Sequence, residues 1–86
     1  MKIGDNKRNY LLYFGKNLEK IRTDRGLSYR QLAQRCDVDF SEISKIEKGE
    51  RNIQLTTIIE LAKGLDKTPK ELFDFEIKAD LDCIAN

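Results

Sequence analysis

The sequence has no histidine, two cysteines, one proline and no long hydrophobic run. Cys36 and Cys83 stand far apart, without a CxxC motif and without a histidine to join them, which excludes a disulfide framework and a zinc site. The longest apolar runs, such as residues 11–14, are too short to cross a bilayer or to form a signal peptide. We therefore expect a cytoplasmic protein with reduced thiols, no membrane contact and no cofactor.

The groups that enzymes use for catalysis are also scarce. The chain has no histidine, no glycine-rich phosphate loop and no nucleophile motif. Cys36 carries a thiol, but its place among apolar residues favours core packing over catalysis. A chain of 86 residues builds one modest core and has no room for a deep cleft with a separate lid. The sequence therefore predicts one domain that is not an enzyme.

Charge is abundant and unevenly distributed. Charged residues make up 36% of the chain, yet the net charge is only +1. Residues 1–53 carry a net charge of +4 and residues 54–86 a net charge of −3. A basic half favours nucleic acid as a partner, although lysine and arginine often do no more than solvate helix faces.

Apolar residues recur at helical spacing in five segments, and no run alternates as a strand would. Three capping boxes predict helix starts, and three glycines predict helix ends. The boxes are Ser28 with Gln31, Asp39 with Glu42, and Thr68 with Glu71, and the glycines are Gly26, Gly49 and Gly64. The expected helices cover residues 9–25, 29–36, 40–48, 55–63 and 69–73, and the fourth has a wide apolar side typical of a central packing helix. The fold class is therefore all-α, a compact five-helix bundle.

Both ends of the chain are expected to lie outside this bundle. Residues 1–9 contain Lys2, Lys7 and Arg8, and we interpret them as a frayed terminus rather than an arm that reaches along DNA. Residues 10–74 form the folded domain. Residues 75–86 are compatible with a strand, a helix or a frayed tail, and they are a candidate dimerisation segment.

Two of the short helices have the proportions of a helix-turn-helix motif. Between residues 29 and 48, two capped helices of about eight residues flank a three-residue turn. Ala33 is small where the helices cross, Val38 fills the turn, and Ile43 and Ile46 hold the second helix against the core. Its opposite face then projects outward, as a helix in the DNA major groove requires.

Residues 15–73 resemble the Cro/C1-type, or XRE-like, helix-turn-helix domains of phage repressors and bacterial regulators. The landmarks are IRTDRGLS, QLA, ISKIEKGER and LAKGLDKTPKELF, in the order and spacing of the family. The short chain and its RN-I-x-L turn also resemble restriction-modification controller proteins, which are dimeric members of this family. The resemblance implies a lambda-repressor-like fold and a dimeric transcriptional regulator of duplex DNA, with no small-molecule inducer expected.

The resemblance also implies which residues meet DNA bases. In the family, the first exposed residues of the second motif helix and one residue a turn later contact base edges, and here these are Phe40, Ser41 and Lys45. Lys45 can donate to guanine, Ser41 can donate or accept, and Phe40 offers only an apolar contact, such as one to a thymine methyl group. Phe40 is equally compatible with a half-buried position against the preceding helix.

Other family positions imply structural and phosphate-binding roles. Arg22 and Glu47 match an ion pair that ties the first helix to the recognition helix. The expected phosphate contacts are Tyr29, Arg30, Lys48, Arg51 and Asn52. Tyr29 departs from the glutamine that is frequent at its position in the family, and it would donate through its hydroxyl group.

Two further departures concern the turn and the local charge. Asp37 occupies a turn position that is usually glycine, and aspartate tolerates a left-handed conformation better than most residues. Residues 36–50 carry a net charge of −3, which is unusual for a surface that faces phosphate. This acidity keeps open a second hypothesis, a protein-interaction module such as an antitoxin that binds a toxin.

A surplus of apolar residues near the C-terminus predicts the dimer interface. A short terminal segment on one small domain cannot bury them all, so we place the two-fold interface on residues 68–84. The candidate interface residues are Leu72, Phe73, Phe75, Ile77 and Leu81. Tyr10 and Tyr13 lie off the core stripe of the first helix and are expected to cover the edge of the core.

Overall fold

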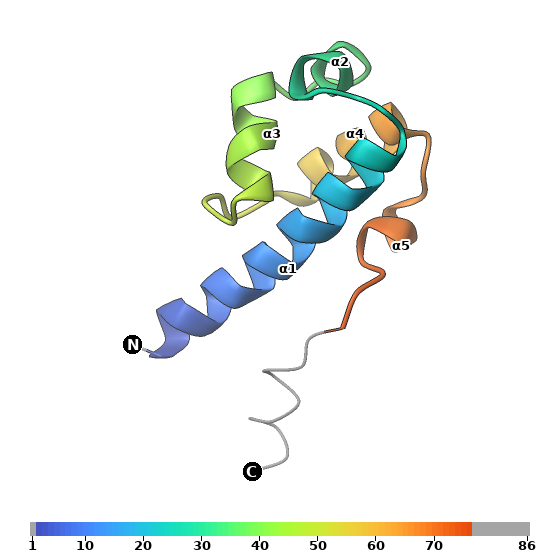
Figure 1. The fold of residues 1–86 in the computed structure, drawn as a ribbon. Helices are drawn as coiled ribbons and strands as arrows, with labels where there is room; N and C mark the ends of the chain where they lie inside the picture. Colours follow the sequence, from blue (N-terminus) through green and yellow to red (C-terminus); the bar gives the residue numbers. More distant parts are fainter. Residues whose placement is uncertain (1, 77–86) are drawn as a thin grey trace.

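The structure is a computed structural model that describes residues 2–76, with side chains from residue 8 onward. Within this range it has five helices and no strand, which confirms the predicted all-α class (Figure 1). The helices are α1 (Lys2–Asp24), α2 (Tyr29–Gln34), α3 (Phe40–Glu47), α4 (Leu55–Leu65) and α5 (Pro69–Leu72).

Helix α1 is the long element against which the rest of the domain is arranged. It packs against α3 on one side and α5 on the other, while α2 and α4 complete the bundle (Figure 1). The Asn17 side chain of α1 donates hydrogen bonds to the carbonyl oxygens of Leu72, at 2.8 Å, and Glu71, at 3.1 Å. The bond to Leu72 satisfies a carbonyl group at the end of α5 that has no partner inside the helix, whereas the Glu71 carbonyl oxygen also accepts from the Asp74 N–H at 3.3 Å.

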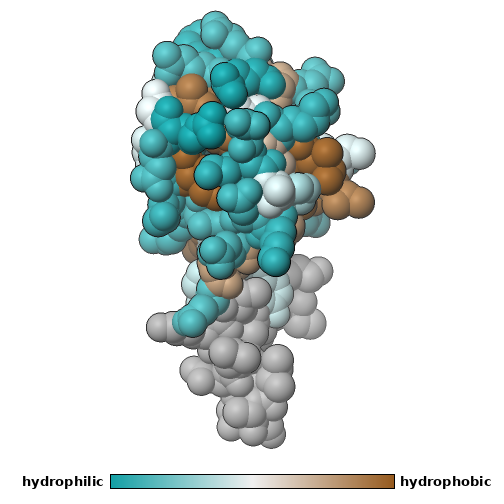
Figure 2. All heavy atoms as spheres, turned by 90° about the vertical axis from the view of Figure 1, so that its right-hand side faces the viewer, coloured by the Kyte–Doolittle hydropathy of each residue, from teal (hydrophilic) through white to brown (hydrophobic). Residues whose placement is uncertain are grey.

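The core draws side chains from all five helices. Leu18, Leu32, Ile43, Leu61 and Leu72 each represent one helix, and each is 0% exposed. Burial of each leucine or isoleucine side chain stabilises the folded state by about 1.5–3 kcal/mol. The face on the α5 side is mostly hydrophilic, with small hydrophobic patches (Figure 2). The core therefore ties the 23-residue α1 to four helices of 4 to 11 residues, which are too short to be stable alone.

Two of the three predicted capping boxes are confirmed. Ser28 with Gln31 opens α2, and Thr68 with Glu71 opens α5 ahead of a proline at the first helical position. The third box is only half formed: the Asp39 side chain accepts from the Ser41 N–H at 3.0 Å, but Glu42 pairs with Arg51 instead of returning to the cap. Arg51 has thus replaced the Asp39 N–H as the partner of the Glu42 carboxylate.

The structure corrects the predicted ends of α1 and α2. Helix α1 begins at Lys2 rather than at residue 9, so residues 2–9 form its first turns and not the expected frayed arm. This stretch contains no proline, so every residue in it has the N–H group that a helix interior needs. Helix α2 ends at Gln34, two residues earlier than predicted, with Arg35 as its C-cap.

The predicted end of α4 at Gly64 is wrong, because the helix continues to Leu65 and is capped by Asp66 in the left-handed conformation at φ 58°. Gly64 is buried inside the helix, where a Cβ atom would lie 2.9 Å from Leu32 Cδ1 and 3.1 Å from Cys36 Cβ. The glycine therefore permits the close approach of α2 and α4 and does not end the helix.

The turn between α2 and α3 does not use the left-handed conformation expected at Asp37. Among the described non-glycine residues, only Asp66 has a positive φ. The Asp37 N–H instead donates to Glu60 Oε1 of α4 at 3.0 Å, and this hydrogen bond lowers the pKa of the Glu60 carboxyl group. A carboxylate from another helix thus stabilises the turn where the family usually has glycine.

Candidate nucleic-acid interface

Helices α2 and α3 meet across the turn, and the inner face of α3 packs against the core. Ile43 and Ile46 of α3 are fully buried, and Ala33 and Val38 are half-buried against the same core. On the outer side, Ser41, Lys45 and Lys48 are exposed, and Phe40 is 38% exposed. The structure therefore presents one side of α3 to solvent and fixes the other.

An ion pair between Arg22 and Glu47 ties α3 to α1. Arg22 Nε donates to Glu47 Oε2 at 2.6 Å, and Nη2 donates to Oε1 at 3.0 Å. Arg22 Nη1 also donates to the Leu27 carbonyl oxygen at 2.7 Å, and the Tyr29 ring lies 4.3 Å from the guanidinium carbon. The hydrogen bond to Glu47 raises the pKa of Arg22 above its ordinary value. This bidentate pair is the arrangement that the family resemblance implies for these two residues.

Comparison with known proteins identifies this helix pair. A family profile described as helix-turn-helix matches residues 18–72. The control protein C.BamHI of Bacillus amyloliquefaciens is 40% identical over 78% of this chain and 84% of its own length. The control protein C.MunI of Mycoplasma sp. is 38% identical over 70% of this chain and 82% of its own. The chain belongs to the helix-turn-helix family.

The fold agrees with a solved structure of the same kind. The crystal structure of the restriction-modification controller protein C.AhdI from Aeromonas hydrophila superimposes with a TM-score of 0.71. It is 43% identical in sequence and covers 73% of this chain and 96% of the controller. The likeness therefore extends over the whole bundle of the controller and not only over the two motif helices.

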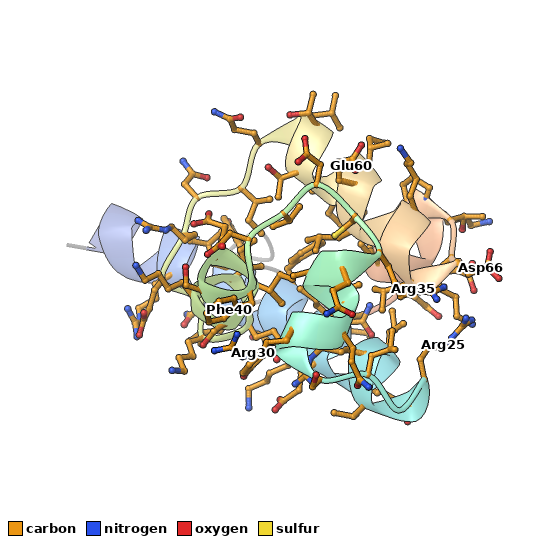
Figure 3. The ribbon with its side chains drawn as sticks, turned by 90° about the horizontal axis from the view of Figure 1, so that it is seen from above. Arg25, Arg30, Arg35, Phe40, Glu60 and Asp66 are labelled. Carbon is orange, nitrogen blue, oxygen red and sulfur yellow. The ribbon has the colours of Figure 1, made fainter. Side chains whose placement is uncertain are left out.

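The three residues predicted to read bases differ in the protein contacts that their side chains make. Lys45 is exposed, and no described residue forms an ion pair or hydrogen bond with its side chain. The Ser41 hydroxyl donates to the Asp39 carboxylate, and this hydrogen bond lowers the pKa of Asp39. The hydroxyl is therefore engaged in the N-cap of α3. Phe40 is 38% exposed and is partly covered by α2, since Arg30 lies over its ring, which agrees with the predicted half-buried position against the preceding helix (Figure 3).

The predicted phosphate contacts lie around the same helix. Arg30, Lys48, Arg51 and Asn52 are exposed, whereas Tyr29 is half-buried beneath Arg22. Arg51 Nε donates to Glu42 Oε1 at 3.1 Å, and both side chains are more than a third exposed. A pair so exposed contributes little to stability, so it does not hold Arg51 away from a phosphate.

The acidic residues of this region are largely engaged. Glu47 pairs with Arg22, Glu42 with Arg51, and Asp39 accepts from Ser41. The net charge of −3 over residues 36–50 thus overstates the repulsion that DNA would meet, because it leaves out Arg22, which is paired with Glu47. The acidity that favoured a protein-interaction module is reduced by these contacts.

The predicted dimer residues separate into three groups. Leu72 is 0% exposed and belongs to the core of its own domain, so its assignment to an interface is wrong. Phe73 is 50% exposed, and Phe75 is half-buried with its ring 6.3 Å from that of Tyr13. Ile77 and Leu81 lie outside the described residues. Leu72 turns inward because α5 packs against both α1 and α4.

Sequence reasoning missed an exposed apolar patch on α4. Leu55 is 71% exposed and Ile59 is 39% exposed, although both were expected on the packing side of the helix. They lie one helical turn apart, and the neighbouring Ile58 lines an apolar groove of about 230 Å³ together with Phe73. We define Leu55 and Ile59 as the apolar patch. A helix that is apolar over so wide an arc cannot bury all of it on one small domain.

Among the side chains that the structure describes, in residues 8–76, no group of three cysteine or acidic residues is placed to hold a metal ion. No helix within residues 2–76 is both long and apolar enough to span a bilayer.

Proposed function

We propose that this protein is a transcriptional regulator that binds a pseudo-palindromic operator in duplex DNA as a homodimer, with α3 in the major groove. The observation that carries the proposal is the presentation of α3, whose inner face is buried while Lys45 and its neighbours are exposed. The named relatives are control proteins, and we propose that this chain likewise controls a restriction-modification system. It acts in the cytoplasm, without catalysis and without a small-molecule inducer.

Selection of bound fragments from genomic DNA tests this function. A regulator of this kind enriches one sequence with two-fold symmetry, whose half-sites are centred about 34 Å apart, because each subunit reads the major groove on the same side of the duplex. Enrichment of no sequence, together with no gel shift at micromolar protein in low salt, would contradict the proposal. That result would favour the protein-interaction module instead.

Lys45→Ala is expected to weaken binding to the selected operator by about 1–3 kcal/mol and to change binding to random DNA little. Lys45 is free of protein partners among the described residues, so its ammonium group is available to guanine O6 and N7. Affinities for operator and random DNA, measured at one salt concentration, give the result. Equal losses on both DNAs would show that Lys45 does not read bases.

Arg51→Ala is expected to weaken binding to operator and random DNA alike. Arg51 leaves the exposed pair with Glu42 and neutralises a phosphate, which releases counterions. The slope of log K against log salt should therefore become shallower by about one unit. Lys20→Ala, at the exposed pair with Asp24 on α1, is the matched control and should leave the slope unchanged. An unchanged slope for Arg51→Ala would remove this residue from the DNA interface.

The dimer contact is proposed to lie on the apolar patch. One recognition helix reads few base pairs, so a single domain would hardly separate its operator from the excess of genomic DNA. Ile59→Glu is expected to weaken the dimer at least about tenfold, because a carboxylate would have to lose its hydration in the interface. Sedimentation equilibrium measures this, with Gln34→Glu at an exposed position of α2 as the control.

A dimer of Ile59→Glu as tight as the parent would place the interface elsewhere, with α1 as the next candidate. Point substitutions are preferable to removing the C-terminal segment. Deleting residues 67–86 would remove Leu72 from the core and would confuse loss of folding with loss of association.

A further inference from the structure

Among the arginines near the recognition helix, Arg30 is the one whose hydrogen bonds are unused. Arg22 donates to Glu47 and Leu27, Arg35 donates to the Gly64 carbonyl oxygen, and Arg51 donates to Glu42. No described residue accepts a hydrogen bond from the Arg30 guanidinium group. The Asp39 carboxylate accepts from Ser41 through Oδ2, and it attracts Arg30 by charge without accepting a hydrogen bond from it.

The position of Arg30 is nevertheless defined by an aromatic contact. Its guanidinium carbon lies 4.2 Å from the centroid of the Phe40 ring, and the two side chains lie side by side in Figure 3. Arg30 is the second residue of α2, and Phe40 is the first residue of α3. The contact therefore brings a cation from α2 to the end of the recognition helix where base edges are read.

A stacked guanidinium group is suited to reading a base. Its carbon lies over the ring, while its N–H donors lie in the plane of the group, along its edge. Two of these donors match guanine O6 and N7 in the major groove, the commonest base-specific contact that arginine makes. The stacking also restricts the rotamers of Arg30 before binding, so less side-chain entropy is lost when Arg30 contacts DNA.

We infer that Arg30, stacked on Phe40, reads one guanine in each half-site and is a main determinant of operator specificity. This inference rests on the proposed function, and it replaces the phosphate contact that the sequence predicts for Arg30. Phe40 is then the positioning residue for the guanidinium group. Its ring also remains 38% exposed, so its uncovered part can contact a neighbouring thymine methyl group.

Arg30→Lys is the decisive variant, because lysine keeps the positive charge and loses the planar fork. The affinity of Arg30→Lys is measured for the selected operator and for operators substituted at one position at a time, and each value is compared with that of the parent. We expect the preference for guanine at one position of each half-site to fall by about 10- to 100-fold. The preference at other positions and the salt slope should be unchanged.

Phe40→Leu tests the positioning role, since leucine stays apolar but cannot stack with the guanidinium group. It should lower the preference for the same guanine, and the double variant with Arg30→Lys should lose little more than Arg30→Lys alone. Arg25→Lys is the matched control, because Arg25 is exposed in the groove between α1 and α5. Its base preferences should equal those of the parent.

The outcomes separate this inference from the proposed function. If the parent selects an operator and Arg30→Lys keeps every base preference, Arg30 does not read a base, and the proposed function stands. If Arg30→Ala weakens all DNA sequences equally, Arg30 contacts phosphate and the inference is overturned. If the parent selects no operator, both are overturned. Thermal denaturation of each variant establishes that it is folded.

Discussion

Arg22→Ala is expected to lower the free energy of unfolding by about 3–5 kcal/mol, since removing one partner of a buried ion pair leaves the other charge without compensation. Arg22 is 8% exposed and Glu47 6% exposed, so water cannot replace the two lost hydrogen bonds. The Leu27 carbonyl oxygen would lose its donor, and the Tyr29 ring its cation. Urea denaturation at neutral pH gives the difference.

The double variant Arg22→Met with Glu47→Leu is the control for this prediction. It removes both charges and fills a similar volume, and such replacements are often neutral or stabilising. We expect its stability to lie within about 1.5 kcal/mol of the parent, well above that of Arg22→Ala. If Arg22→Ala is as stable as the parent, the pair makes no contribution and α3 is held by its apolar contacts alone.

Gly15→Ala is expected to destabilise the domain by about 2 kcal/mol, because it would overpack the contact between α1 and α3. A Cβ atom at Gly15 would lie 2.5 Å from the Glu47 carbonyl oxygen and 2.6 Å from that of Ile46. Both are backbone atoms, so no side chain can rotate away, and one helix must shift. Helix propensity alone predicts the opposite sign, a gain of about 1 kcal/mol.

Denaturation of Gly15→Ala beside Lys16→Ala decides between these effects. Lys16 is the exposed neighbour on the same helix, so its substitution reports propensity without the tertiary contact and should change stability by less than about 0.5 kcal/mol. A Gly15→Ala variant more stable than the parent would mean that α1 and α3 are not in such close contact. Weaker operator binding is also expected, because the shift would move the recognition helix.

The features that were predicted correctly depend on residues close together in the chain. The capping boxes at Ser28 and Thr68 act within one helical turn, so their sequence signals are complete in four residues. The five helices follow from apolar spacing in the same way. The Arg22–Glu47 pair was predicted from family resemblance, because nothing local connects residues separated by 25 positions.

The tertiary structure decided what each surface faces and which partner each side chain takes. Glu42 left its capping box for Arg51, Gly64 stayed inside a helix because α2 approaches it, and Leu72 entered the core. Leu55 and Ile59 remained exposed although their pattern indicates burial. The stacking of Arg30 on Phe40 also depends on the angle at which two helices meet. Helix starts depend on neighbours along the chain, whereas burial and pairing depend on which distant segments arrive alongside.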